Sequence, residues 1–296
     1  MKILPVYRCP QDRSAKAGTS QQSGPVSHTA LQPQLIAHHG SMRIWALSDL
    51  HLSLASDKPM DVFGEHWRDH HQRMASAWDE LVDDEDIMIT PGDLSWARNT
   101  AEAAADFAWL AARPGHKVLV KGNHDHWWPG TKRKLAETLP PRCHALKKTA
   151  CIIQGVGFFG ARGGDFAPLK RYGDQRSDAD IEKALAKEDV ELAASITHLS
   201  ILEKELGQPC QLRIACFHYP PIPPGANTSR FTGPIQQAGA SYCIYGHLHG
   251  SQLGAAKVEG LFEGVQYTCA SCDQIAFRPL LVHYCSSSPL QGPRQS

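Results

Sequence analysis

Short apolar runs alternate along this chain with longer segments in which apolar residues recur every three to four positions. The first pattern is typical of buried strands, and the second of helices that pack one face against a core. Their alternation predicts βαβ units around a largely parallel sheet, and therefore an α/β fold. The clearest strand-like runs are Arg43–Ser48, Ile87–Thr90, Lys117–Val120, Leu212–Phe217 and Tyr242–Tyr245.

Three further segments are predicted to be helical. An amphipathic helix is indicated by the spacing of Trp67, His71, Met74, Trp78 and Leu81. A second helix should begin near Asn99, because Glu102 follows at the spacing of a capping box. It should bury Phe107 and Leu110. The charged, Ala/Leu-rich segment 177–206 predicts one long helix or two short ones.

The remaining strand-like runs and the two ends complete the predicted organisation. Val265–Ala270 and Phe277–Tyr284 are predicted to belong to a second sheet, which Cys151–Phe159 would join. Residues 1–41 and 285–296 show neither period, so we expect disordered tails on either side of one domain over residues 42–284. Because Met42 directly precedes the first strand, an internal translation start there is a hypothesis that mass spectrometry would test.

Five short polar motifs each follow a predicted strand. They are Asp49-Leu50-His51, Gly92-Asp93, Gly122-Asn123-His124-Asp125, Phe217-His218 and Gly246-His247-Leu248-His249. Ligands of open α/β sheets bind beyond the carboxyl ends of the strands, and the glycines should let the chain turn sharply there. One such motif alone is more often a capped strand end. The ordered set of carboxylate, amide and imidazole groups instead indicates a site for two divalent metal ions.

This ordered set resembles the motifs of the calcineurin-like metallophosphoesterases: D-x-H, G-D, G-N-H-D/E, a lone H and G-H-x-H. The segments 92–97 and 122–128 are similar to the GD-x-SWA and GNHD-x-WW blocks of bacterial phosphohydrolases in that superfamily. The resemblance runs from about Met42 to about Tyr284. It implies a four-layer α/β/β/α sandwich that hydrolyses a phosphate mono- or diester through attack by a metal-bridging hydroxide.

The same resemblance implies a role for each motif residue. It assigns the first ion to Asp49, His51, Asp93 and His249. It assigns the second ion, which Asp93 would share, to Asn123, His218 and His247. His124 would act as general acid, and Asp125 would orient it, support its loop or form a structural ion pair. These donors suit two divalent ions, with Mn²⁺ preferred and Fe, Zn²⁺ or a mixture as alternatives, and the absence of thiolate argues against a closed structural zinc site.

The second motif departs from that of the protein Ser/Thr phosphatases in this superfamily. Those enzymes extend it to G-D-x-x-D-R-G, whereas Trp96 and Ala97 stand here at the later Asp and Arg positions. Protein-phosphatase activity is therefore disfavoured, and a different cation must bind the phosphate. Arg98 and Arg162 are candidates, although a surface salt bridge is the simpler interpretation of each.

Composition limits the partners and the compartment. Lys+Arg and Asp+Glu both number 30, so a net charge of zero makes nucleic acid an unfavourable partner. No apolar run approaches the ~20 residues of a membrane span. Nine scattered cysteines suit a reducing, cytoplasmic location, and Cys269-Ala-Ser-Cys272 is interpreted as buried or strand-end thiols, with a redox or zinc role as the alternative. The sequence leaves the oligomeric state open.

The principal hypothesis is a metal-dependent phosphoesterase whose partner is a phosphate-ester substrate. A non-catalytic metal-binding scaffold and a nuclease are the alternatives. Substrate contacts are expected from the 161–176 segment with Lys170 and Arg171, from Pro220–Arg230, and from Trp127-Trp128 unless these pack in the core. The other histidines of the first helix region, His66, His70 and His71, are expected to face solvent or neighbouring loops.

Overall fold

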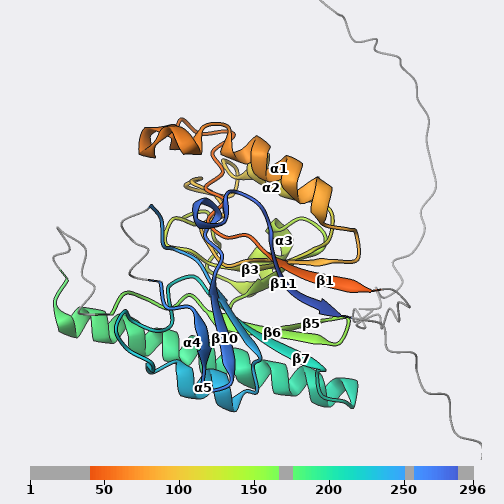
Figure 1. Ribbon diagram of the computed structural model, residues 1–296, viewed down its shortest axis with the longest axis vertical. Coiled ribbons are helices and arrows are strands. Elements are labelled where there is room, and N and C mark those ends of the chain that lie inside the picture. The colour runs from red at the N-terminus through yellow and green to blue at the C-terminus, as the bar shows by residue number, and fades with distance from the viewer. Residues whose placement is uncertain (1–40, 167–175, 251–256, 286–296) are drawn as a thin grey trace, which may run out of the picture. The chain divides into compact units, whose positions relative to one another are not determined.

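Two β-sheets lie face to face in the computed structural model, which describes residues 41–166, 176–250 and 257–285 (Figure 1). The first sheet has the order β11-β1-β2-β3-β4, and β11 alone is antiparallel to its neighbour. Its strands are β1 (Met42–Ala46), β2 (Ile87–Thr90), β3 (His116–Val120), β4 (Cys143–Leu146) and β11 (Leu280–Cys285).

The second sheet has the order β5-β6-β7-β8-β10-β9. Its four inner strands are parallel, and an antiparallel strand lies at each edge. The strands are β5 (Cys151–Ile153), β6 (Val156–Ala161), β7 (Leu212–Phe217), β8 (Tyr242–Tyr245), β9 (Gly260–Phe262) and β10 (Val265–Cys269). Both sheets are thus rich in parallel pairs, as the alternation of strand-like and helix-like segments predicts.

Helices cover the outer face of each sheet (Figure 1). The first sheet is covered by α1 (His70–Leu81), α2 (Ala104–Ala111) and α3 (Lys132–Thr138). The second is covered by α4 (Asp178–Leu206) and α5 (Thr232–Gln237). Within the described residues, three short 3₁₀ helices lie in connections: η1 (Met60–Phe63), η2 (Glu65–Trp67) and η5 (Cys272–Ile275).

Side chains that alternate along the strands divide the interior into three cores. Trp45 packs with the helices on the first sheet, whereas its neighbours Ile44 and Ala46 pack between the sheets. In the same way Phe159 packs with α4 and Phe158 packs between the sheets. This alternation is the period of two that pleated strands impose. The four-layer α/β/β/α sandwich is therefore confirmed.

The first predicted helix exists but is shorter than its pattern suggests. Met74 and Trp78 of α1 are fully buried, whereas Trp67 lies before the helix, in η2. His70, expected among the solvent or loop-facing histidines, is buried, because it lies one helical turn before Met74 on the same face. Its Nδ1 and Nε2 lie within 3.2 and 3.4 Å of the Trp67 and His51 carbonyl oxygens.

The other two predicted helices differ in how they begin. Asn99 does cap a turn, since its Oδ1 accepts the backbone N–H groups of residues 101 and 102, but α2 starts only at Ala104. The Glu102 carboxylate bonds the backbone N–H of Arg98 rather than that of Asn99, so the predicted capping box is wrong. The 177–206 segment forms one continuous helix, α4, which begins with a true capping box at Ser177.

One predicted strand lies in the other sheet. The sequence predicts that the 277–284 run joins the second sheet, but β11 pairs antiparallel with β1, from Met42 opposite Cys285 to Ala46 opposite Leu280. Alternation specifies that a strand has a buried face and does not specify its partner. After β10 the chain crosses through η5 to the first sheet, where β1 offers an unpaired edge. Val265–Ala270 and Cys151–Phe159 do contribute to the second sheet.

The predicted tails fall outside the described residues except for Ser41 and Cys285, so the domain limits 42–284 stay a prediction. β11 ends at Cys285, one residue beyond the predicted boundary. Among the described helices, none has the length and apolar character that a membrane crossing demands. The eight described cysteines are free thiols.

Candidate metal centre

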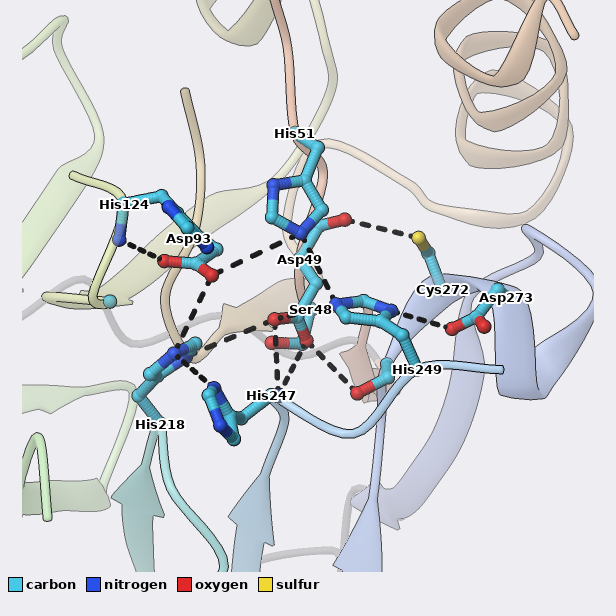
Figure 2. Close-up of polar contacts among 12 residues, drawn as sticks. Ser48, Asp49, His51, Asp93, His124, His218, His247, His249, Cys272 and Asp273 are labelled. Atoms are coloured by element: carbon cyan, nitrogen blue, oxygen red, sulfur yellow. Dashed lines mark hydrogen bonds and ion pairs between the residues drawn. The ribbon is translucent and has the colours of Figure 1, made fainter. Parts of the chain in front are cut away.

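Six of the seven predicted ligands fall into two groups at one edge of the sandwich, beyond the carboxyl ends of the parallel strands (Figure 2). The first group is Asp49, His51 and His249, and the second is Asp93, His218 and His247. Within each group, one potential ligand atom from every residue lies within 4.8 Å of the others. Each group takes residues from both sheets, because 49, 51 and 93 follow strands of the first sheet and 218, 247 and 249 follow strands of the second.

Asp93 lies between the two groups. Its Oδ2 is 3.6 Å from His218 Nε2 in its own group and 3.9 Å from His51 Nε2 in the other. Within the first group, His249 Nε2 lies 3.2 Å from His51 Nε2 and 3.4 Å from Asp49 Oδ1. One carboxylate oxygen therefore faces nitrogen donors of both groups.

Asn123, the seventh predicted ligand, joins the second group through His218. The Asn123 Oδ1 lies 2.7 Å from His218 Nε2, and His247 Nδ1 lies 3.2 Å from the same nitrogen. His218 Nδ1 lies 3.0 Å from the Pro91 carbonyl oxygen and donates a hydrogen bond to it. Because that bond fixes the proton on Nδ1, the Nε2 lone pair of His218 points at the group.

The backbone at these positions is unusual. Asp49, His51, Asp93 and His247 adopt left-handed conformations, with φ of 59°, 45°, 50° and 73°. Such a conformation costs a non-glycine residue ~1–3 kcal/mol and persists only where the surroundings impose it. The hydrogen bonds from Asp49 N to Gly92 O and from His51 N to Asp93 O, 3.1 and 2.9 Å, hold the two loops in this state. The strain lies at four of the seven predicted ligands, which is typical of functional sites.

The three motif glycines serve two different purposes. Gly92 has a φ of 103° and makes the expected sharp turn. Gly122 and Gly246 have no positive φ, and each is required for close approach instead. A Cβ at Gly122 would overlap the Asp93 carboxylate, and one at Gly246 would overlap Ser48 Oγ and the Asp49 carboxylate.

Replacing Gly246 with alanine should loosen the site without touching a ligand. The added methyl group must push Asp49 away from its position, so we expect metal affinity to fall by about 10–100-fold, as when the support of a ligand is removed. Isothermal titration of metal-stripped protein with Mn²⁺ measures this. Gly250→Ala is a poor control because Gly250 has a φ of 76°, whereas Gly233→Ala meets no atom within 4 Å and should leave affinity unchanged.

Burial and mutual contacts set the protonation of the first group. Burial alone would raise the pKa of Asp49, but the neighbouring imidazoles, chiefly His249, outweigh burial and hold it well below its usual value. Burial lowers the pKa of His51 well below 6.5, and that of His218 is lowered for the same reason. Burial opposes protonation of His249, but Asp49 and Asp273 raise its pKa to about 10. Asp49 is therefore an ionised oxygen donor, and His51 and His218 are neutral, the forms that bind metal.

The sequence profile of the calcineurin-like phosphoesterases matches residues 42–251, more than half of the chain. The chain belongs to the calcineurin-like phosphoesterase family. Membership, together with the two ligand groups, supports a metal-dependent phosphoesterase acting on a phosphate ester.

Individual relatives are similar over shorter stretches or at low identity. The Gene 66 protein of Mycobacterium phage D29 is 39% identical over 89 residues, which is 29% of this chain and 42% of the phage protein. That of Mycobacterium phage L5 is 32% identical over 81 residues, 27% and 39% of the two chains. The match thus spans less than half the length of these relatives.

Solved structures with a similar fold include a phosphopantetheinyl hydrolase from Mycobacterium tuberculosis, with a TM-score of 0.46, 14% identity and coverage of 88% of this chain and 99% of that one. A protein of unknown function from Aquifex aeolicus has a TM-score of 0.43 and 14% identity. The match covers 81% of this chain and 95% of that one. The family assignment depends on the profile match alone.

His124, the predicted general acid, lies beside the first group. Its backbone N–H donates to Asp93 Oδ1 at 2.8 Å, so the same carboxylate that faces both groups also holds the His124 backbone. Its ring is half-buried, with its centroid 5.7 Å from that of His51 and 4.1 Å from that of Trp96. Trp96 also stacks on His51 at 5.0 Å and 21°. Trp96 thus packs its indole against His124, and it stands at the position where the protein phosphatases of this superfamily have an aspartate.

Asp125 supports the loop that carries Asn123 and His124. Its carboxylate accepts the Gly122 and Ser95 backbone N–H groups at 2.7 and 3.2 Å and the Trp127 indole N–H at 2.9 Å. Burial, with Asp93 adding, raises its pKa to about 6. These contacts favour the loop-supporting role among the three considered for it. Trp127 and Trp128 are buried in the core with Phe107, so packing rather than ring stacking on substrate accounts for them.

Arg98 and Arg162, the two arginines considered as partners for the substrate phosphate, differ in position. Arg98 is 82% exposed and pairs with Glu102 at 3.1 Å, the surface salt bridge considered for it. Arg162 follows β6, and its carbonyl oxygen accepts the N–H groups of His218 and Tyr219 at 3.1 and 2.9 Å, so it lies beside the second group. Its guanidinium also lies 3.5 Å from the Glu188 carboxylate. Lys170 and Arg171 lie outside the described residues.

Three residues that the sequence motifs do not assign to the site contact the first group. They are Ser271, Cys272 and Asp273, which follow β10. Cys272 Sγ donates to the Asp49 carbonyl oxygen at 3.1 Å, and both cysteines of Cys269-Ala-Ser-Cys272 are buried thiols, as interpreted. The position of Asp273 could have indicated its role, because it is a polar residue that follows a strand, as the residues of the five motifs do.

Proposed function

We propose that this chain hydrolyses a phosphate mono- or diester with two divalent ions, bound by Asp49, His51, Asp93, Asn123, His218, His247 and His249. The observation that carries the proposal is the position of Asp93 Oδ2, within 3.9 Å of a nitrogen donor of each group. The donor set fits such ions: two carboxylates, one amide and four imidazoles, with imidazole nitrogens 3.2 Å apart in both groups. Mn²⁺ is the preferred ion, and Fe, Zn²⁺ or a mixture would fit the same donors.

The bound ions would supply Lewis acidity toward the phosphoryl oxygens and would lower the pKa of water. The chain contributes the proton and the positioning. His124 donates a proton to the departing alkoxide, and its place is held by Asp93 at the backbone and by Trp96 at the ring. Asp125 fixes the loop that carries His124. Arg162 is the candidate cation for the substrate phosphate, since it lies beside His218.

The proposal extends to the setting of the enzyme. The eight described cysteines are thiols, which suits a reducing, cytoplasmic compartment. Trp96 and Ala97 replace the Asp-Arg pair of protein phosphatases, so we expect substrates other than phosphoproteins. The nuclease alternative would require a local basic surface, because the net charge of the chain is zero.

An activity screen tests this function. Protein loaded with Mn²⁺ should cleave phosphate monoesters or diesters in a panel that includes aryl esters, nucleotides and cyclic dinucleotides. Removal of metal by a chelator should lower the rate by ~10²-fold or more, and Mn²⁺ should restore it. Elemental analysis on the same samples identifies the ions. Two bound ions without turnover of any ester would favour the scaffold, and turnover of nucleic acid alone, with steep salt dependence, would favour the nuclease.

A further inference from the structure

The segment after β10 connects the two sheets at the candidate metal centre. Ser48 N–H donates to the Ala270 carbonyl oxygen at 2.7 Å, and Cys272 N–H donates to the Ser48 carbonyl oxygen at 3.1 Å. The Ser271 hydroxyl donates to Asp49 Oδ2 at 3.0 Å. Three consecutive residues that follow β10 of the second sheet thus hold the backbone of Ser48 and the carboxylate of Asp49, the first ligand on the first sheet.

Asp273, the next residue, holds the His249 ring at Nδ1, the nitrogen that does not face the ligand group. Its Oδ1 accepts His249 Nδ1–H at 2.8 Å (Figure 2). Its Oδ2 accepts the Gly250 N–H at 2.8 Å and the Gln274 amide at 3.3 Å. The Asp273 side chain is 3% exposed. Both carboxylate oxygens are therefore used, one on the ring of a ligand and one on the backbone that follows it.

This contact decides which nitrogen of His249 faces the site. Because Nδ1 carries the proton donated to Asp273, Nε2 is the ring atom that offers a lone pair when the imidazole is neutral. His249 Nε2 is the atom that lies 3.2 Å from His51 Nε2 and 3.4 Å from Asp49 Oδ1. In the second group the comparable carboxylate is farther away, since Asp165 Oδ1 lies 3.9 Å from His247 Nε2.

We infer that Asp273 is a positioning residue for the first ligand group: it fixes the tautomer and the orientation of His249, and it thereby increases the affinity of that group for its ion without contacting the ion. The inference rests on the proposed function, because it requires that the first group bind a metal. Loss of the Asp273 side chain should therefore weaken the binding of one of the two ions and leave the binding of the other unchanged. A purely structural role, such as holding the Gly250 loop, would not produce that selectivity.

The test compares Asp273→Asn and Asp273→Ala in the full-length protein, stripped of metal and titrated with Mn²⁺ by calorimetry and chelator competition. Asparagine offers one acceptor oxygen in place of two, so it cannot accept from both His249 and Gly250. We expect one of two ions to bind about 10–100-fold more weakly in Asp273→Asn, the range for lost support of a ligand, and more weakly still in Asp273→Ala. The other ion should keep its affinity, and excess Mn²⁺ should restore turnover.

The matched control is Glu263→Gln, which removes one exposed carboxylate from the β9–β10 turn and should leave both affinities unchanged. The inference is overturned if Asp273→Asn weakens both ions equally, weakens neither, or unfolds when stripped of metal. If Asp273→Ala fails to fold, Asp273→Asn decides. A wild-type protein that binds no pair of ions would instead refute the proposed function, so the two failures are distinguishable.

Discussion

His124→Gln should turn over alkyl phosphate esters about 10²–10⁴-fold more slowly than the wild type, the contribution of a lost general acid. Glutamine keeps a hydrogen-bond donor of similar reach but cannot transfer a proton. An aryl ester with an acidic phenol leaving group needs little protonation, so the same variant should lose much less activity on such a substrate. Steady-state kinetics on an alkyl and an aryl ester of the same class provide the comparison.

Two controls accompany this variant. His126→Gln changes an exposed histidine two residues away and should leave both rates near wild type. Elemental analysis should show unchanged metal content in His124→Gln, because the replacement keeps the backbone N–H that donates to Asp93. An equal loss of activity on the two esters would contradict the acid role, and an unfolded variant would show that His124 is instead a structural residue of the core.

Asp93→Asn should reduce the occupancy of both ions. The replacement keeps the size of the side chain and an acceptor for His124 N–H, but it removes the charge of the one carboxylate that faces donors of both groups. We expect both ions to be lost on dialysis and turnover to fall by ~10²-fold or more, since the paired ions act together. Elemental analysis before and after dialysis measures the loss.

Comparison with Asp273→Asn makes the Asp93 result specific, since both variants remove one buried negative charge near the site. Asp93→Asn should affect two ions, whereas the other variant should affect one. If Asp93→Asn still holds two ions tightly, the bridging assignment is wrong, although binding of metal by the remaining ligands would stand.

Much of the site could be predicted because parallel strands end at a common edge. Asp49 and Asp93 follow the neighbouring parallel strands β1 and β2, and that placement predicts that they meet. His218 follows β7 of the second sheet, so its position beside them also depends on how the two sheets pack. The distances between them, and the left-handed backbone at two of the three, depend on contacts between loops that no local pattern encodes.

What the sequence did not reveal depends on partners distant along the chain. β11 alternates like any half-buried strand, and only the edge left open by β1 decides its sheet. The sequence predicts a turn at Gly246, whereas the structure shows that the packing of Ser48 and Asp49, nearly two hundred positions earlier, excludes a larger side chain there. Asp273 does not stand out in the sequence, because a single aspartate after a strand has no distinctive spacing. Its significance comes from its contact with His249, which precedes it by 24 positions.

Each ligand group takes its members from both sheets, and this has a consequence for folding. An ion held by such a group would cross-link the two halves of the sandwich, so metal loading and the native state form one linked equilibrium. Any ligand that binds only the folded chain stabilises it, by ~2.7 kcal/mol at a free concentration one hundred times its dissociation constant. The persistence of this enzyme in a cell would then track the supply of its ions as well as the quality of its hydrophobic cores.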